Sequence, residues 1–196
     1  MERVVLLDEG GRAAGTADKA TVHHEDTPLH LAFSCYLFNE RGELMLTRRA
    51  LGKRTWPGVW TNTCCGHPAP GETPHDAVLR RLGEELGLHL DHIELVLPRF
   101  RYRAVMGNGV VENEMCPVFR AIAEPVPAPN PAEVDDTRWV PWTGLVDGVR
   151  DGSADISPWA ALQITELAGL GPDPLAWPTG DAAELPTAAR EPMSTA

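Results

Sequence analysis

A turn that contains two cysteines and a histidine is the strongest chemical signal in the sequence. Cys65 supplies a thiol, His67 supplies an imidazole that can bind a metal ion, and Gly66 between them permits a tight turn. Gly66 also opens a longer pattern that reads G-x5-E-x7-R-R-L-G-E-E-L-G-L. Thiols, imidazoles and paired glutamates are the groups that nucleophilic and metal-dependent chemistry needs. The turn and the segment after it therefore form the first candidate site.

Three histidines and two glutamates form a candidate metal site. Glu112 and Glu114 lie two positions apart on a predicted strand, so both carboxylates face the same side. Residues 26–28 form an Asp-Thr-Pro bend that can return the chain between two of the histidines. Such a set suits zinc or manganese, and suits magnesium less well. The five candidate ligands are His23, His30, His67, Glu112 and Glu114.

Two other interpretations of these residues stay open on spacing alone. Most surface histidines bind nothing, and a Glu-x-Glu pair on a strand is usually a solvated face. A structural zinc site of Cys64, Cys65 and His67 is the second alternative. Its C-C-x-H spacing is cramped for the usual zinc loops.

Basic residues near the glycine pattern indicate an anionic ligand. Arg81 and Glu85 are four residues apart on a predicted helix, where a simple salt bridge contributes about 0.3–0.5 kcal/mol. The functional interpretation gives them separate roles, with Glu85 on magnesium and Arg81 on phosphate oxygens. The further candidate cations are Lys19, Arg48, Arg49, Lys53 and Arg54.

The elements that must position these residues are a capped helix and several strands. Thr73 precedes Pro74 as a predicted N-cap, and the helix extends to about Leu86 before Gly87 ends it. Strands interrupted by helices favour an α/β or α+β fold in which helices cover a mixed sheet. The other predicted elements are a hairpin from 31 to 47, strands at 94–102, 110–121 and 136–141, and a helix at 158–167.

Composition narrows the classes of function. The 196 residues carry a net charge of −11, which argues against a general nucleic-acid-binding surface. No apolar run approaches the roughly 20 residues that span a bilayer, and the charged N-terminus does not resemble a signal peptide. The four cysteines form no disulfide-framework pattern, so we expect a reducing cytoplasm. We expect a monomer, with a dimer as the alternative.

The segment from 171 to 196 differs from the rest in composition. It is rich in proline, alanine and acidic residues. We therefore expect one domain over residues 1–170, followed by a disordered tail over 171–196 that has no catalytic role.

Several segments together resemble a known family. The pattern from Gly66 is close to the Nudix box, except that Arg81 stands where the hydrolases carry a glutamate. This box, including the arginine at position 81, is similar to the corresponding segment of the type I isopentenyl-diphosphate isomerases. The resemblance extends from about Val4 to Leu167. The segments that carry it are 29–33 (LHLAF), 47–50 (TRRA), 56–62 (WPGVWTN), 65–68 (CGHP), 100–103 (FRYR), 112–114 (ENE) and 157–159 (SPW).

The resemblance implies a Nudix-type fold and roles for individual residues. It implies that Cys65 and Glu114 are catalytic, with Tyr102 as a catalytic hydroxyl. It makes His23, His30, His67, Glu112 and Glu114 the ligands of one zinc or manganese (or magnesium) ion. Glu85 completes a magnesium site with the diphosphate. The implied substrate-binding residues are Lys19, Arg49, Lys53, Arg81 and Trp159.

The implied reaction moves a carbon–carbon double bond in a small homoallylic diphosphate, converting isopentenyl to dimethylallyl diphosphate for isoprenoid synthesis. An unactivated alkene needs a strong acid and a dry site, and Glu114 with Tyr102 is the expected protonating side. Cys65 is expected to act from the opposite face, with nearby cations or a metal ion favouring its thiolate. Which of the two is the acid stays open.

Two other functions compete with this one. A Nudix hydrolase would need the glutamate that Arg81 replaces, and it gives Cys65 no task. A non-catalytic module that binds metal or phosphate is the third interpretation, and it predicts binding without turnover.

Overall fold

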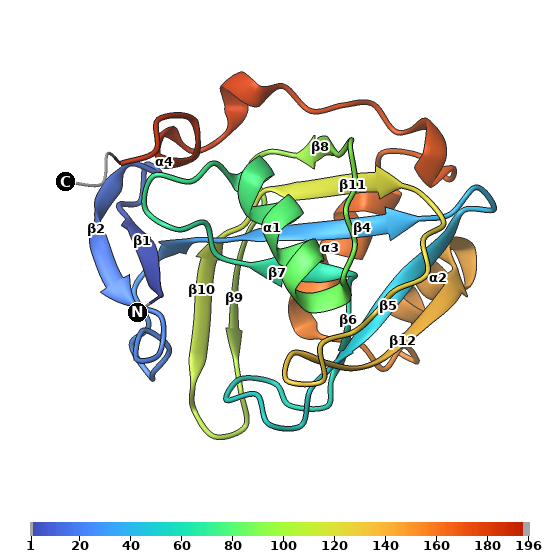
Figure 1. The fold of residues 1–196 in the computed structure, drawn as a ribbon, viewed down its shortest axis with the longest axis horizontal. Helices are drawn as coiled ribbons and strands as arrows, with labels where there is room; N and C mark the ends of the chain where they lie inside the picture. The colour runs from blue at the N-terminus through green and yellow to red at the C-terminus, as the bar shows by residue number, and fades with distance from the viewer. Residues whose placement is uncertain (1, 194–196) are drawn as a thin grey trace.

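The computed structural model describes residues 2–193, and its strands form two sheets (Figure 1). The five-stranded sheet has the spatial order β2 (Ala13–Asp18), β1 (Arg3–Leu7), β3 (His30–Leu31), β10 (Val111–Met115) and β9 (Arg101–Val105). The seven-stranded sheet has the order β12 (Val134–Pro141), β5 (Glu43–Arg49), β4 (Phe33–Phe38), β11 (Val118–Ile122) and β8 (Glu94–Leu97), with β6 (Trp60–Thr61) beside β5 and β7 (Cys64–Gly66) beside β4.

Helices cover both faces of the seven-stranded sheet. Figure 1 shows α1 (Pro74–Leu86) in front of β4 and α3 (Pro158–Ala168) behind it, and α2 (Trp142–Asp151) follows β12. Short helical turns come last: η1 (Pro174–Ala176), η2 (Ala182–Glu184) and α4 (Thr187–Arg190). The prediction of an α+β fold with a mixed sheet between helices is confirmed, because β4 pairs parallel with β11 and antiparallel with β5.

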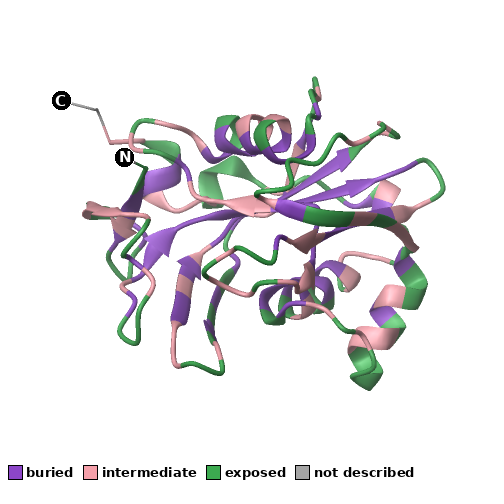
Figure 2. Cartoon of the chain, turned by 60° about the horizontal axis from the view of Figure 1, so that its bottom comes forward, coloured by how far each residue is buried: buried purple, intermediate pink, exposed green. Residues whose placement is uncertain are grey.

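Alternation along β4 divides the core into two clusters. Phe33, Cys35 and Leu37 pack under the apolar stripe of α1, whereas Tyr36 and Phe38 face the cluster that contains α3. Both sets are buried because the strand has a helix on each face. In Figure 2 the buried segments gather in the strands at the middle of the molecule, with exposed segments in the turns around them.

The local signals for α1 correspond to its geometry. The Thr73 hydroxyl accepts a hydrogen bond from the backbone N–H of Asp76, and Pro74 occupies the first turn. Gly87 ends the helix with φ +65°, a left-handed conformation that favours glycine. The predicted N-cap and stop are confirmed.

Two predicted strands are each divided in the structure. The expected strand 94–102 separates into β8 and β9 around Pro98, and the expected strand 110–121 separates into β10 and β11 at Pro117. Proline has no N–H to donate to a sheet. At Pro117 the chain also leaves one sheet and enters the other.

The segment after residue 171 is not the disordered tail that its composition suggested. It crosses the top of the molecule in Figure 1 and ends beside β1 and β2. Trp177 is 3% exposed and packs against the rings of Phe38 at 5.4 Å and Trp142 at 5.2 Å. The N–H of Ala188 donates to the carbonyl of Gly11 at 3.0 Å. The expectation of disorder is therefore wrong for residues 171–193. No helix in residues 2–193 is long and apolar enough to cross a membrane.

Removing the Trp177 side chain should destabilise the whole domain. Because the indole fills a buried position between two aromatic rings, Trp177→Ala is expected to lower the free energy of unfolding by about 3–5 kcal/mol. Urea denaturation measures this change. Val126→Ala, at a side chain that is 92% exposed, is the control and should stay within about 0.5 kcal/mol. A loss of less than about 1 kcal/mol for Trp177→Ala would indicate that the segment is not packed.

Candidate metal centre and diphosphate cleft

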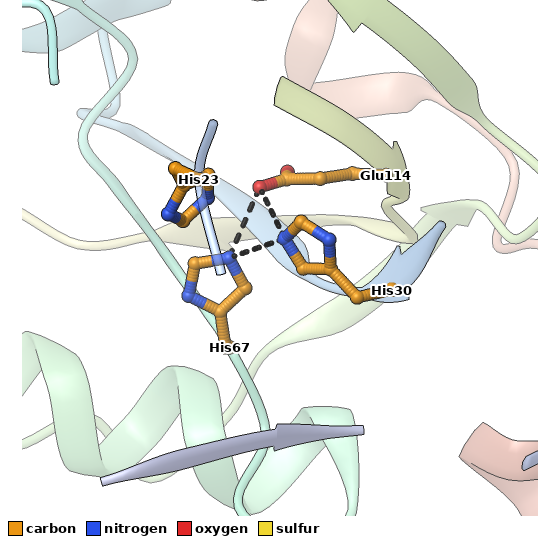
Figure 3. Close-up of side chains that lie close together, drawn as sticks. All are labelled: His23, His30, His67 and Glu114. Carbon is orange, nitrogen blue, oxygen red and sulfur yellow. Dashed lines mark hydrogen bonds and ion pairs between the residues drawn. The ribbon is translucent and has the colours of Figure 1, made fainter. Parts of the chain in front are cut away.

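Three imidazoles and one carboxylate converge on a single point (Figure 3). Ligand atoms of His23, His30, His67 and Glu114 all lie within 4.8 Å of one another. The Oε1 atom of Glu114 is 3.0 Å from Nε2 of His67 and 3.4 Å from Nε2 of His30. His30 is fully buried, and Glu114 is 6% exposed.

Strand pairing brings these four residues together from distant parts of the sequence. The parallel pairing of β3 with β10 sets His30 opposite Glu114. His67 directly follows β7, whose pairing with β4 sets Gly66 opposite Phe33. The loop that carries His23 is held against β10, because the N–H of Val111 donates to the carbonyl of residue 24 at 3.0 Å.

The donor set fits a divalent metal ion. Nδ1 of His67 and Nε2 of His23 are buried and have no hydrogen-bond partner among the described residues, an expensive arrangement for ring nitrogens. Burial lowers the pKa of His23 to about 3 and that of His67 to about 4, so both imidazoles are neutral at pH 7, the form that binds metals. Hydrogen bonds from His30 and His67 outweigh burial and hold the pKa of Glu114 well below its usual range.

Glu112, the fifth predicted ligand, is not part of this group of four. It lies on the same face of β10 as Glu114 and is linked to it through Tyr102. The Tyr102 hydroxyl contacts Oε2 of Glu114 at 2.8 Å and Oε2 of Glu112 at 3.1 Å. Burial, and then the charge of Glu114, raise the pKa of Glu112 to about 7. Tyr102 and the two carboxylates thus form one buried hydrogen-bonded unit beside the imidazoles.

Cys65 lies on β7 opposite Ser34 of β4, and it lines the same cleft as the metal group. Burial raises the pKa of its thiol to about 12, and the opposing charge of Arg49 is a smaller effect. Among the described residues burial therefore outweighs the charge of Arg49, and our expectation that nearby cations or a metal ion favour the thiolate stays a prediction. Cys64 packs in the core beneath α1 at 1% exposure. Cys65 packs against the other core cluster, and neither cysteine belongs to the group of possible metal ligands found in residues 2–193, which argues against the alternative zinc site of both cysteines with His67.

Two of the predicted diphosphate-binding cations, Arg81 and Lys53, meet at one group of carboxylates that includes Glu85. The Arg81 guanidinium donates to Glu85 through Nε at 2.9 Å and to Glu84 through Nη1 at 3.0 Å. Nη2 also donates to Glu133 at 3.2 Å, and Lys53 forms an ion pair with the same carboxylate. Arg81 is 5% exposed and Glu85 is 7% exposed.

Sequence reasoning did not identify Glu133. It directly precedes β12, whose register sets Val134 opposite Arg49 of β5. The N–H of Ala50 donates to the Glu133 carbonyl at 3.0 Å. This pairing joins segments more than 80 residues apart, and no local sequence pattern predicts it.

The remaining predicted residues line one cleft of about 630 Å³. Arg49 lies over the Trp159 ring, with 5.8 Å between the guanidinium carbon and the ring centroid, and donates to the carbonyl of Thr55 at 3.1 Å. Lys19 pairs with Glu2 at 2.6 Å. Eleven of the thirteen predicted site residues line this cleft: Lys19, His23, Arg49, Lys53, Cys65, His67, Arg81, Tyr102, Glu112, Glu114 and Trp159. The other two, His30 and Glu85, are not among its lining residues.

Residues 28–160 match the NUDIX domain family. The chain is 64% identical to an isopentenyl-diphosphate Delta-isomerase of Saccharopolyspora erythraea, over 96% of this chain and 97% of that protein. It is 59% identical to the enzyme of the same name from Mycolicibacterium vanbaalenii, over 87% of this chain and 94% of that protein. The chain belongs to the isopentenyl-diphosphate Delta-isomerase family.

Solved structures with the same fold support the Nudix assignment. The Deinococcus radiodurans protein DR0079 matches with a TM-score of 0.66 at 20% identity, over 84% of this chain and 98% of that one. A MutT protein from Methanosarcina mazei matches with a TM-score of 0.60 at 18% identity, over 74% of this chain and 96% of that one. At such low identity these two likenesses concern the fold alone. Membership of the isomerase family rests on the closer relatives.

Binding of a divalent ion should stabilise the protein through the histidine group. Mn²⁺ at about 100 times its dissociation constant is expected to raise the free energy of unfolding by about 2.7 kcal/mol. The increment should vanish in His30→Ala and persist in His75→Ala, where the replaced side chain is 50% exposed. Urea denaturation with and without Mn²⁺ measures it within each variant. An equal increment in His30→Ala would contradict this site.

Proposed function

We propose that this chain isomerises isopentenyl diphosphate to dimethylallyl diphosphate, as the names of its relatives say of them. One observation carries the proposal: a single cleft combines a thiol, a buried Tyr–Glu unit and a cluster of cations. Cys65 lies on the seven-stranded sheet and Glu114 on the five-stranded sheet, so two acid–base groups approach the cleft from different elements. A hydrolase has no evident use for the thiol.

The diphosphate is the anchor in this proposal and does not react. Lys19, Arg49, Lys53 and Arg81 are the proposed contacts for its oxygens, and arginine forks suit such oxygens. Glu85 is the proposed carboxylate that holds Mg²⁺ for the diphosphate. The ion would neutralise phosphate charge beside the carboxylates around Arg81. Anchoring holds the alkene in place between the two reacting sides.

The proposed chemistry is the gain of one proton and the loss of another. An acid adds a proton to the terminal alkene carbon, which leaves a tertiary carbocation. A base then removes a proton from the carbon between the cation and the CH₂O group, which forms the new double bond. Glu114 with Tyr102 serves one proton transfer and Cys65 the other. Burial raises the pKa of Glu112 and that of Cys65, so the Glu112 carboxyl beside Tyr102 and Glu114 can hold one proton and the thiol can hold another.

Two further groups protect this intermediate. The Trp159 ring is the proposed wall against the cation, and a desolvated cation–π contact contributes about 2 kcal/mol. A zinc or manganese ion, with magnesium as the alternative, is proposed for the histidine group, with Glu112 as a further ligand, and would act as a Lewis acid that strengthens the acidity of groups around it. The four cysteines are unpaired, which supports our proposal that the protein works in a reducing cytoplasm. We propose a monomer, with a dimer as the alternative.

Turnover in deuterated buffer tests the proposed function directly. Native protein with Mg²⁺ and Mn²⁺ is expected to convert isopentenyl diphosphate to dimethylallyl diphosphate that carries solvent deuterium. Cys65→Ala should abolish the product because one proton acceptor or donor is lost, and proton NMR follows both compounds. Release of inorganic phosphate or of a monophosphate would indicate a hydrolase instead. Binding without turnover in well-folded, metal-loaded native protein would leave only a binding module.

Loss of one cation should weaken substrate binding more than it slows the reaction. Lys53→Met keeps the length of the side chain and removes its charge, so KM for isopentenyl diphosphate is expected to rise roughly tenfold while kcat changes little. Steady-state kinetics separate the two constants. Arg150→Met, at a side chain 69% exposed on α2, is the matched control and should leave KM unchanged. A large fall in kcat with constant KM would assign Lys53 to the chemical step.

A further inference from the structure

Asn62 connects the cysteine turn to the aromatic wall of the cleft. Its side chain is fully buried and lies between β6 and β7. Nδ2 donates to the carbonyl of Cys64 at 2.7 Å and to that of Cys35 at 3.1 Å. Oδ1 accepts a hydrogen bond from the indole Nε1–H of Trp159 at 3.2 Å. A single amide therefore contacts the peptide that leads into Cys65 and the side chain of Trp159, and both residues line the cleft.

Two hydroxyl groups complete this connection, and their proton directions follow from the contacts. The Thr61 hydroxyl donates to Oδ1 of Asn62 at 2.9 Å, so it must accept from the Ser157 hydroxyl, which is 2.8 Å away. Ser157 Oγ in turn accepts from the backbone N–H of Ala160 and caps α3. Both hydroxyl residues are at most 2% exposed. The chain of donors leads from the first turn of α3 to Asn62.

The other contacts of Trp159 do not fix its ring in this way. Its centroid lies 5.6 Å from that of Trp56 and 6.2 Å from that of Tyr102, and Arg49 lies over its face. Such ring contacts tolerate sliding and tilting far more than a buried hydrogen bond does. The bond to Asn62 is the directional restraint that sets where the indole lies relative to the cysteine turn.

We infer that Asn62 is a positioning residue that fixes the separation between Trp159 and Cys65, an inference that rests on the proposed function. It is not among the residues that line the cleft, and it acts through these two neighbours. The separation matters because the carbocation between them has two fates. Loss of a proton to a base gives dimethylallyl diphosphate. Addition of water, with release of a proton from that water, gives a tertiary alcohol that keeps the diphosphate. A displaced ring admits the water.

The test measures how many turnovers end in the alcohol. Asn62→Ala removes the whole connection, and Thr61→Val removes only one hydroxyl at nearly constant shape. Each lost hydrogen bond is expected to raise the alcohol-to-alkene ratio and lower kcat by roughly three- to tenfold, with KM within about twofold of native. Proton NMR of the products gives the ratio. It also detects the Trp159 indole proton, identified by its absence in Trp159→Phe, which should shift in Asn62→Ala.

Asn39→Ala is the matched control. Asn39 is also a fully buried asparagine with hydrogen bonds to its own turn, but it lies in the β4–β5 hairpin and does not line the cleft. Its loss should lower stability without changing the alcohol ratio. In a Trp159→Phe background, Asn62→Ala should add less to the ratio than it does alone.

The outcomes separate the inference from the function beneath it. An alcohol ratio in Asn62→Ala and Thr61→Val equal to that of native protein and Asn39→Ala, at normal turnover, would overturn the positioning role. So would a fully additive effect in the Trp159→Phe background. Native protein that forms no dimethylallyl diphosphate would overturn the proposed function, and the inference with it.

Discussion

The parallel pairing that passes from β3–β10 into β4–β11 is the constraint on which the site depends. β3 and β4 are separated only by Ala32, whose N–H donates to the carbonyl of Met115 at 2.9 Å. The N–H of Ser34 donates to the carbonyl of Pro117 at 3.0 Å, just after the crossing. Two segments of the chain, β3–β4 and β10–β11, thus leave one sheet and enter the other side by side. On one side of the crossing lie the imidazole and the carboxylate of the metal group, and on the other lies the strand that pairs with Cys65.

This crossing explains which parts of the molecule could be predicted from the sequence. The cap and the stop of α1 depend on residues within a few positions of each other, so local rules found them. The change of sheet at Pro117 depends on a partner more than 80 residues away, and the approach of Glu133 to Lys53 joins residues 80 positions apart. The site residues themselves were named through the family resemblance. Spacing alone left the histidines, the zinc alternative and the salt bridge undecided.

The C-terminal segment shows why composition misled. Proline, alanine and acidic residues suggest that a segment cannot bury enough apolar surface to compensate its loss of entropy. The average composition of the segment does not show where single residues pack. One tryptophan fits between Phe38 and Trp142, and two alanines pack in the apolar cluster beside β1. A few well-placed contacts with an existing domain suffice, because that domain supplies the rest of the core. Average composition bears on whether a segment folds alone, whereas this segment packs against a domain that is already there.

The surroundings of Arg81 indicate what its departure from the hydrolase pattern achieves. Glu84, Glu85 and Glu133 all contact its guanidinium, and Lys53 is the second cation of the group. Three carboxylates therefore face two cations. A glutamate at position 81 would leave four carboxylates and one cation, and so much negative charge would require several metal ions to bring in a diphosphate. With arginine the cluster is close to neutral, so in the proposed function a single divalent ion would give it the positive charge to hold a diphosphate. The arginine would therefore suit a site that holds the phosphates still better than one that gathers metal ions for attack on phosphorus.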